Sequence, residues 1–275
     1  MTSKRVALVT GCSDGGIGFY VCQKLAERDF VVYATSRSLS STEGLQHPNI
    51  KRLELDVRND TQVSSVVSTV IAESGQIDLL INNAGVISAG PLVEWTAEQA
   101  KDVYDTNVFS IIRVCGAVVP HMAKRKTGTI VNMGSVVGEI PTPWTGIYDS
   151  SKAAVRSLTD TLFMECKPLN IRVMLAAPGT IKSKLADKQD DFELVSGSLY
   201  TSFFHNIRQR MEASRDNKTM STDVFAGKLV AQALKPHPPR YFSIGGYVST
   251  YRLLSWLPRG FGLWMFWRMF SQPRK

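Results

Sequence analysis

The stretch RVALVTGCSDGGIG, residues 5–18, decides the fold of this chain. Its first half is an apolar, β-branched run typical of a buried strand, and its second half is a glycine-rich turn that leads into a helical stretch at 17–28. Glycines allow a ligand to approach the backbone, and the first amides of a helix carry a partial positive charge. The stretch therefore predicts a dinucleotide-binding turn, with an ordinary tight turn as the alternative.

The alternation of strand and helix continues through the first 245 residues. Apolar runs without polar alternation, typical of strands covered on both faces, lie at 30–34, 51–55, 77–81, 128–133, 171–176 and 240–244. Helical stretches follow them, for example at 61–73 and 147–166. This order predicts an α/β protein with a three-layer, Rossmann-type, doubly wound parallel sheet. We expect a single domain at 1–246, with a substrate-covering segment at about 180–217, and a C-terminal extension at 247–275.

The composition is that of a globular protein, with 275 residues of which 44% are hydrophobic. Four scattered cysteines without CxxC or metal-type spacing predict reduced thiols and no metal site; they are Cys12, Cys22, Cys115 and Cys166. The chain runs from its first residues directly into a strand, without an apolar leader, so we expect the catalytic body to face the cytosol.

The net charge of +8 is unevenly distributed. Residues 1–223 hold 24 basic and 24 acidic side chains, whereas residues 224–275 hold eight basic and no acidic ones. This distribution differs from a nucleic-acid-binding face spread over a fold. It predicts a local anionic partner, either phospholipid headgroups or a phosphate-bearing substrate.

The end of the strand at 30–34 bears on the choice of cofactor. It continues as Thr35-Ser36-Arg37, without a carboxylate nearby. An NAD site usually has Asp or Glu here to bind the ribose 2′-hydroxyl, whereas an arginine binds a 2′-phosphate. The sequence favours NADPH, unless Arg37 is only a solvated surface residue. Asp56, after the next strand, is a candidate partner for the adenine amino group or a helix-start residue.

Tyr148 and Lys152 stand four residues apart at the start of the helical stretch 147–166, which places both on one face. A free phenol ionises near pH 10, and a neighbouring ammonium should lower its pKa toward neutrality. Ser135 follows the strand at 128–133, at the edge where a parallel sheet presents its ligands, and is suited to bind a substrate oxygen beside Tyr148.

Three amides complete the candidate site. Asn107 lies in a long helical stretch, where an asparagine has no advantage in helix propensity. Asn82 and Asn83 follow the strand at 77–81 and either line the cofactor or tie neighbouring strands together.

These motifs together resemble the short-chain dehydrogenase/reductase family from Arg5 to about Gly246. The matching elements, in the family's order, are the TG…GIG turn, Asp56-Val57, the run NNAG at 82–85, Asn107, Ser135, the Tyr148–Lys152 pair and Pro178-Gly179-Thr180-Ile181. The resemblance implies reduction of a carbonyl by NADPH, with Tyr148 as proton donor. It further implies that Lys152 holds the nicotinamide ribose and tunes Tyr148, that Ser135 orients the substrate, and that Asn107 anchors a water relay to Lys152.

The resemblance also implies a set of cofactor-binding residues. They are Gly11, Ser13, Gly16, Ile17, Gly18, Arg37, Asp56, Asn83, Ala84, Gly85, Tyr148, Lys152, Pro178, Gly179, Ile181 and Ser183. Residues 178–181 would close over the nicotinamide carboxamide, with Ser183 where the family often has threonine. The turn departs from the family's TGxxxGIG by one extra residue, which leaves open which amides of residues 13–15 face the pyrophosphate.

The extension is rich in aromatic residues and arginine. Ten aromatics lie between 241 and 270, namely Tyr241, Phe242, Tyr247, Tyr251, Trp256, Phe261, Trp264, Phe266, Trp267 and Phe270. Pro258, Arg259 and Arg268 interrupt the apolar run before it reaches the roughly 20 residues that span a bilayer. Such a segment suits a membrane interface, which predicts monotopic attachment. Packing on its own domain, lining the substrate cleft and a subunit contact are the alternatives.

The whole pattern looks like the fungal 1-acyldihydroxyacetone-phosphate reductases. That resemblance implies NADPH-dependent reduction of a lipid ketone to 1-acylglycerol 3-phosphate (lysophosphatidate), at the cytosolic face of the endoplasmic reticulum or of lipid droplets. A steroid or retinoid oxidoreductase on the same scaffold is one alternative, and a non-catalytic NADPH-sensing scaffold is another. The intact Tyr148, Lys152, Ser135 and Asn107 argue against the latter. Homo-oligomer formation is left open.

Overall fold

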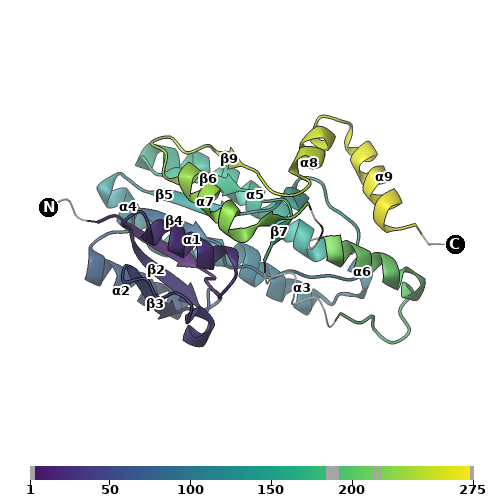
Figure 1. Ribbon diagram of the computed structural model, residues 1–275, viewed down its shortest axis with the longest axis horizontal. Coiled ribbons are helices and arrows are strands. Elements are labelled where there is room, and N and C mark those ends of the chain that lie inside the picture. The colour runs from purple at the N-terminus through teal and green to yellow at the C-terminus, as the bar shows by residue number, and fades with distance from the viewer. Residues whose placement is uncertain (1–3, 184–191, 214–215, 217, 273–275) are drawn as a thin grey trace.

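The computed structural model describes residues 4–183, 192–213, 216 and 218–272. Seven parallel strands form one sheet in the order β3-β2-β1-β4-β5-β6-β9 (Figure 1). The strands are β1 Val6–Thr10, β2 Val31–Ser36, β3 Ile50–Glu54, β4 Leu79–Asn82, β5 Thr129–Met133, β6 Arg172–Ala176 and β9 Tyr241–Phe242. The predicted doubly wound parallel sheet is therefore confirmed, and the strands lie where the sequence placed them. A second, two-stranded sheet of β7 Ile181–Lys182 and β8 Met220–Ser221 was not predicted.

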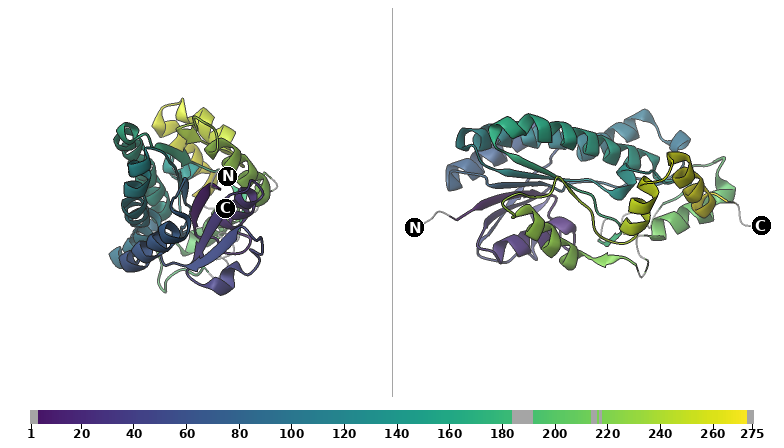
Figure 2. Two further views of the ribbon diagram at one scale, coloured as in Figure 1. Left: turned by 90° about the vertical axis from the view of Figure 1, so that its left-hand side faces the viewer. Right: turned by 90° about the horizontal axis from the view of Figure 1, so that it is seen from above.

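Helices cover both faces of the main sheet, giving the three layers expected from the sequence (Figure 2). One face carries α1 Ile17–Ala26 and α7 Thr222–Ala233. The other carries α2 Asp60–Ser74, α4 Ser110–Arg125 and α5 Gly146–Cys166. The remaining helices are α3 Ala97–Tyr104, which a π-helical turn at Asp105–Phe109 joins to α4, and α6 Phe204–Glu212, α8 Val248–Ser255 and α9 Arg259–Phe270. Short 3-10 turns occur at Leu39–Thr42, Leu92–Glu94, Val136–Gly138, Lys167–Leu169 and Thr201–Phe203.

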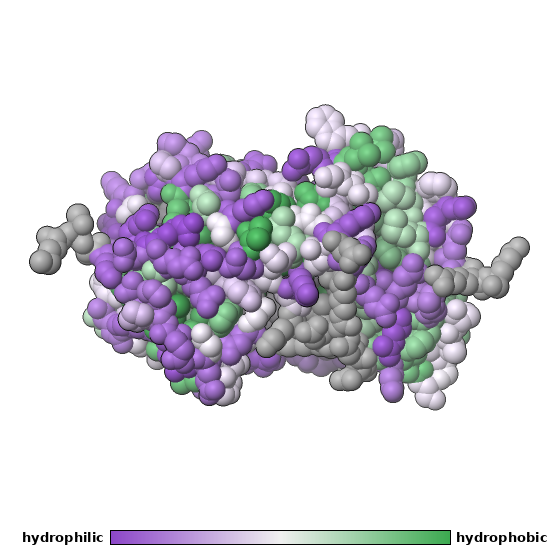
Figure 3. All heavy atoms as spheres, viewed as in Figure 1, coloured by the Kyte–Doolittle hydropathy of each residue, from purple (hydrophilic) through white to green (hydrophobic). Residues whose placement is uncertain are grey.

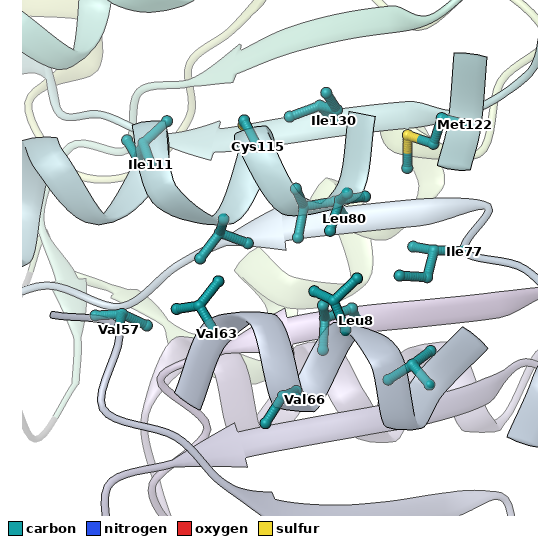
Figure 4. Close-up of a cluster of buried hydrophobic side chains, with 14 of the residues drawn as sticks. Leu8, Val57, Val63, Val66, Ile77, Leu80, Ile111, Cys115, Met122 and Ile130 are labelled. Atoms are coloured by element: carbon teal, nitrogen blue, oxygen red, sulfur yellow. The ribbon is translucent and has the colours of Figure 1, made fainter. Parts of the chain in front are cut away.

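The layer beneath α2 shows why these residues form these elements. Val63, Val66 and Val70 recur at helical spacing, and all three are buried in the core beneath α2. Figure 4 shows Val63 and Val66 in this layer. Each such burial contributes about 1.5–3 kcal/mol. The side chain of Asn59 caps the start of α2 by accepting from a backbone amide, and Gly75 ends it with a left-handed φ of 72°.

The strand order of the main sheet reverses between β1 and β4, because β2 and β3 lie on one side of β1 whereas β4, β5, β6 and β9 lie on the other. The ends of these two strands are tied closely. The hydroxyl of Thr10 accepts from the amides of Asn83 and Ala84, and Asn83 Nδ2 donates to the carbonyls of Thr10 and Gly11, all at 2.8–3.0 Å. In open parallel sheets, ligands bind outside such a reversal point.

Two glycines make this close approach possible. Gly11 has a φ of 73°, and a Cβ on it would lie 2.7 Å from Ala84 Cα. A Cβ on Gly18, which is buried in the first turns of α1, would lie 2.6 Å from the carbonyl oxygen of Gly11 and 2.7 Å from Asn83 Nδ2. Such contacts force the backbone of the turn to move.

We expect Gly18→Ala to lower the free energy of unfolding by about 1–3 kcal/mol, because the new methyl group overpacks the turn. Gly116→Ala is a matched control, since Gly116 is also a helical glycine but has open space around it. That control should gain up to about 1 kcal/mol from helix propensity. Urea unfolding of both variants measures the difference, and equal effects would contradict the packing role of Gly18.

Candidate active site

A cavity of about 630 Å³ lies at the carboxyl ends of the strands, beside the reversal point. Its size falls in the range of cofactor and small-molecule sites. Most of the residues predicted from the sequence to bind the cofactor line it. They are Gly11, Ser13, Gly16, Ile17, Arg37, Asp56, Asn83, Ala84, Gly85, Tyr148, Lys152, Pro178 and Ser183.

Three predicted cofactor residues are not among those that line the cavity. Gly18 lies behind the turn, against Gly11 and Asn83. Gly179 packs on the backbone of Gly246, where a Cβ would meet the carbonyl oxygen. Ile181 is buried in the hydrophobic cluster between the sheet and the α1–α7 layer. Their places in the structure give them a packing role that holds the cavity wall.

The extra residue of the glycine turn has a structural explanation. The amide of Asp14 donates to the carbonyl of Ser41 at 2.7 Å, and its carboxylate accepts from the amide of Gly44 at 3.2 Å. The longer turn thus reaches across to the segment that follows β2. Gly16 starts α1 without any side-chain cap, so the helix N-terminus remains suited to an anion.

Hydroxyl groups cluster beside Arg37, at the end of β2. Ser36 Oγ lies 2.7 Å from Ser41 Oγ and 3.2 Å from Ser13 Oγ, and all three serines line the cavity. A guanidinium with neighbouring hydroxyls is a donor set suited to a phosphate. Sequence reasoning found Arg37 but missed Ser36 and Ser41, although the serine-rich run at 36–41 was a visible signal.

A second arginine reaches this end of the cavity. Arg58 holds the Asp56 carboxylate with its side chain, from Nε at 3.1 Å and from Nη2 at 2.8 Å, and with its backbone amide at 3.0 Å. This contact is the main reason that the pKa of Asp56 is lowered, and the charge of Arg37 adds to it. Asp56 lines the cavity as predicted, but as half of an ion pair with Arg58, which the sequence analysis overlooked.

The catalytic candidates meet at the other end of the cavity. Tyr148 and Lys152 lie in the first two turns of α5, and the Lys152 ammonium is 5.6 Å from the centre of the Tyr148 ring. Lys152 Nζ donates to the carbonyl of Met133 at 2.8 Å. Ser135, just after β5, lies close enough to the phenol to lower its pKa. The structure therefore brings together the three residues that the sequence singled out.

The expected pKa of Tyr148 was wrong. The pKa of Tyr148 is raised to about 12, mainly because the phenol is desolvated; the charge of Asp149 adds to the rise, and Ser135 and the charge of Arg210 oppose it only in part. The ammonium that was expected to lower it is itself buried, and this desolvation lowers the pKa of Lys152 to about 8. Tyr148 is therefore protonated at neutral pH, which is the state that a proton donor requires.

Asn107 is buried in the π-helical turn between α3 and α4. Its Oδ1 accepts from the amide of Val86 at 2.8 Å, while Nδ2 donates to the carbonyl of Val86 and to Ser151 Oγ. A Cβ on Gly85 would lie 3.2 Å from Asn107 Oδ1 and 3.7 Å from Lys152 Nζ, so only a glycine separates the two. Asn107 thus connects the wall after β4 to the catalytic helix. Its role in a water relay stays a prediction.

Of the two readings left open for Asn82 and Asn83, the contacts show strand ties for both. Asn82 Nδ2 donates to Asn132 Oδ1 on β5 at 2.9 Å, and Asn132 Nδ2 donates to Thr159 on α5 at 3.0 Å. This buried chain links β4, β5 and the catalytic helix. Asn83 binds the end of β1, as described above, and also lines the cavity.

A buried carboxylate next to Tyr148 was missed entirely. Asp149 Oδ2 accepts from the amide of Thr142 at 2.7 Å and from the hydroxyl of Thr145 at 3.1 Å, which fixes the loop before α5. Burial raises the pKa of Asp149 to about 6, against the pull of Arg210. Arg210, on α6, donates from Nε to Thr142 Oγ1 at 2.8 Å. Only the fold brings this arginine, 62 residues along the chain, within electrostatic reach of the phenol.

The family model of short chain dehydrogenases matches residues 5–194, and the chain belongs to that family. It is accordingly an oxidoreductase that uses a nicotinamide dinucleotide.

The relatives named in sequence comparisons cover almost the whole chain. It is 34% identical over 261 residues to the NADPH-dependent 1-acyldihydroxyacetone phosphate reductase of Saccharomyces cerevisiae, covering 91% of this chain and 86% of that one. It is 32% identical over 259 residues to a 3-ketodihydrosphingosine reductase of Bacteroides thetaiotaomicron, covering 92% and 93%. A crystal structure of a short-chain dehydrogenase from Streptomyces avermitilis has the same fold, with a TM-score of 0.80, 23% identity and 91% of each chain covered.

The residues present fit a nicotinamide dinucleotide. The uncapped N-terminus of α1 and the glycine turn suit the pyrophosphate, and the cavity extends from there to Tyr148 and Lys152. When bound, the cofactor supplies the hydride. Among the chain's own groups, the phenol of Tyr148 keeps its proton at neutral pH because desolvation raises its pKa, and the Met133 carbonyl holds the ammonium of Lys152 near the ring.

We expect Tyr148→Phe to lower the turnover number by roughly 10²–10⁴-fold, because the variant lacks the proton donor while the ring still fills its place. Affinity for NADPH should change little, because the phenol oxygen is small against the rest of the cavity. Steady-state kinetics and fluorescence titration with NADPH measure the two effects. Turnover near the wild-type rate would show that another residue donates the proton.

Proposed function

We propose that this protein reduces a lipid ketone with NADPH, and that its substrate is 1-acyldihydroxyacetone phosphate, which becomes 1-acylglycerol 3-phosphate. The observation that carries the proposal is the pairing, in one cavity, of a protonated, partly buried Tyr148 with the arginine and hydroxyl cluster at Arg37. The first suits proton donation to a carbonyl, and the second suits the 2′-phosphate that distinguishes NADPH from NADH.

The preference for NADPH rests on the charge at the end of β2. Arg37 and Arg58 both line the cavity there, and the carboxylate of Asp56 between them is already neutralised by its contact with Arg58. Ser13, Ser36 and Ser41 add hydroxyl donors. A relative that is named as NADPH-dependent supports the same assignment.

Arg37→Asp should reverse the cofactor preference, because a carboxylate repels a 2′-phosphate and accepts from a 2′-hydroxyl. We expect the ratio of kcat/KM for NADPH to that for NADH to fall by about 100-fold, which corresponds to about 2.7 kcal/mol. Arg28→Asp is the matched control, since Arg28 is an exposed arginine just beyond α1. An unchanged ratio in Arg37→Asp would remove Arg37 from the phosphate site.

Two features support an acylated, phosphate-bearing substrate. Aromatic and aliphatic side chains of α8 and α9 pack against Tyr148 and the loop after Ser135, which makes one side of the site apolar. Arg210, which donates to Thr142 and lies over the ring of Phe270 at 5.7 Å, is close enough to the phenol to lower its pKa and places a positive charge near the reacting group. A phosphate is favoured by such a cation, whereas the ammonium group of 3-ketodihydrosphingosine is disfavoured by it.

We further propose that the reaction takes place at the cytosolic face of the endoplasmic reticulum or of lipid droplets. A long-chain ketone partitions into lipid, and an enzyme at the surface meets it there. The acid-free, basic region from residue 224 onward supports attraction to an anionic surface.

NADPH oxidation with a panel of ketones tests the substrate. We expect the highest kcat/KM for 1-acyldihydroxyacetone phosphate, with lower values for 3-ketodihydrosphingosine, a 17-ketosteroid and retinal. Arg210→Gln should raise KM for the phosphorylated ketone by about tenfold, the loss of roughly one charge-assisted hydrogen bond, and leave KM for the uncharged ketones nearly unchanged. A higher kcat/KM for the steroid or for retinal would contradict the proposed substrate but would still agree with a carbonyl reductase.

A further inference from the structure

The C-terminal extension folds back onto the domain as a helical hairpin of α8 and α9. It lies at the carboxyl end of the strands, the same end as the active site (Figures 1 and 2). Trp144 Nε1 donates to the carbonyl of Phe270 at 2.7 Å, and Asn206 Nδ2 donates to that of Gln272 at 3.0 Å. The alternative of packing on its own domain, left open by the sequence, is thus realised, but only by one face of the hairpin.

The inner face of the hairpin forms a hydrophobic cluster with the loop that follows β5. Tyr251 and Phe266 meet with ring centres 5.2 Å apart, and Phe270 is buried beside them. Val137 and Ile140 of the loop complete the cluster, and Tyr148 packs against it. The inner face of the hairpin therefore packs against Tyr148 and the loop that follows β5, and it is not free to bind a partner.

The outer face of the same hairpin is apolar and exposed. Large hydrophobic side chains that contact solvent follow one another from residue 253 to 269, with Trp256 at 85% exposure as the extreme. They are Leu253, Trp256, Leu257, Phe261, Leu263, Trp264, Trp267 and Met269. Hydrophobic residues gather visibly over this end of the molecule (Figure 3). Single exposed apolar residues are common on protein surfaces, but a contiguous patch of this kind marks an interaction site.

The charges around the patch indicate what covers it. Arg252, Arg259 and Arg268 are exposed on the hairpin, and Arg268 lies over the ring of Trp264 at 5.6 Å. There is no acidic side chain from residue 224 onward. A second copy docked face to face would place these arginines against their own equivalents, with no carboxylate on the hairpin to pair with them. A lipid surface instead offers phosphates to the arginines and an interface to the tryptophans.

The hairpin is too short to cross a bilayer, since the 12 residues of α9 reach about 18 Å. Among the described residues, one helical stretch, Ala97–Arg125, is long and apolar enough to do so by length and composition alone. Val108, Ile111 and Val114 of that stretch are buried in the main core, however, so it belongs to the sheet layers. The outer face of the hairpin is therefore the candidate surface for contact with lipid.

We propose that the outer face of the α8–α9 hairpin docks peripherally on an anionic phospholipid surface, with its tryptophans at headgroup depth and its arginines on the phosphates. This rests on the proposed function only for its purpose: the inner face of the hairpin contacts the loop of the catalytic residues, so docking would hold the active site close to the lipid that contains the ketone.

Cosedimentation of the full chain with sucrose-loaded vesicles tests the docking surface without any need for turnover. Wild-type protein should bind vesicles of phosphatidylcholine with phosphatidylserine more tightly than vesicles of phosphatidylcholine alone, and the difference should shrink with salt. The triple variant Trp256→Gln, Trp264→Gln, Trp267→Gln should bind at least about tenfold more weakly to both. The pair Arg252→Gln, Arg268→Gln should lose the preference for the anionic vesicles.

The double variant Met164→Gln, Leu169→Gln is the matched control, because it removes two exposed apolar residues, one in the last turn of α5 and one in the 3-10 turn that follows. It should bind vesicles as the wild type does. NADPH affinity and thermal unfolding, measured on every variant, show that the domain remains folded. Wild-type binding to neither vesicle, or an unaltered triple variant, overturns the docking surface.

Sedimentation velocity without lipid tests whether a second copy of the chain, and not a lipid surface, covers the outer face of the hairpin. If the wild type is a dimer that ignores vesicles and the triple variant is a monomer, the patch is a contact between copies and the proposal is wrong. The two proposals also fail separately. Vesicle binding without reduction of any ketone in the panel contradicts the proposed function alone, and reduction without vesicle binding contradicts the docking surface alone.

Discussion

The close contact between the ends of β1 and β4 is the constraint on which the rest of the site depends. Thr10 and Asn83 exchange four hydrogen bonds there with each other and with adjoining backbone. Gly11 and Gly18 leave no room for a side chain between these segments. This contact fixes the glycine turn at the point where the sheet reverses, and so aims the start of α1 into the cavity.

Burial governs the chemistry at the other end of the cavity. Two groups that carry or exchange protons, the partly buried Tyr148 and the buried Lys152, lie close together and are largely desolvated, so each favours its neutral form more than it would in solution. For Tyr148 this retains the proton that the reaction consumes. The hydrogen-bonded chain from Asn82 through Asn132 to Thr159 holds the helix that bears both residues against the sheet. The packing of this helix against the sheet thus determines both the positions of Tyr148 and Lys152 and their protonation states.

The hairpin of α8 and α9 joins the two parts of the proposed function. Apolar side chains lie around most of the surface of the hairpin, and helices of this kind are usually buried on all sides. On one side of the hairpin, Tyr251, Phe266 and Phe270 are buried against the domain. The apolar side chains on the other side are exposed. A lipid surface on the exposed face would hold a lipid substrate close to the active site, which the buried face of the hairpin contacts.

The sequence alone determined the sheet, the glycine turn, the Tyr148–Lys152 spacing and the basic end of the chain, because these follow from short-range patterns: strand runs, glycines beside a helix start, and one helical turn. The tertiary structure alone decided the rest. It placed Arg58 on Asp56, gave Gly18, Gly179 and Ile181 packing roles, brought Arg210 near the phenol, and raised the pKa of Tyr148 where the sequence implied a fall. Each of these depends on desolvation or on distances between residues far apart in the chain, and neither quantity is written in local sequence.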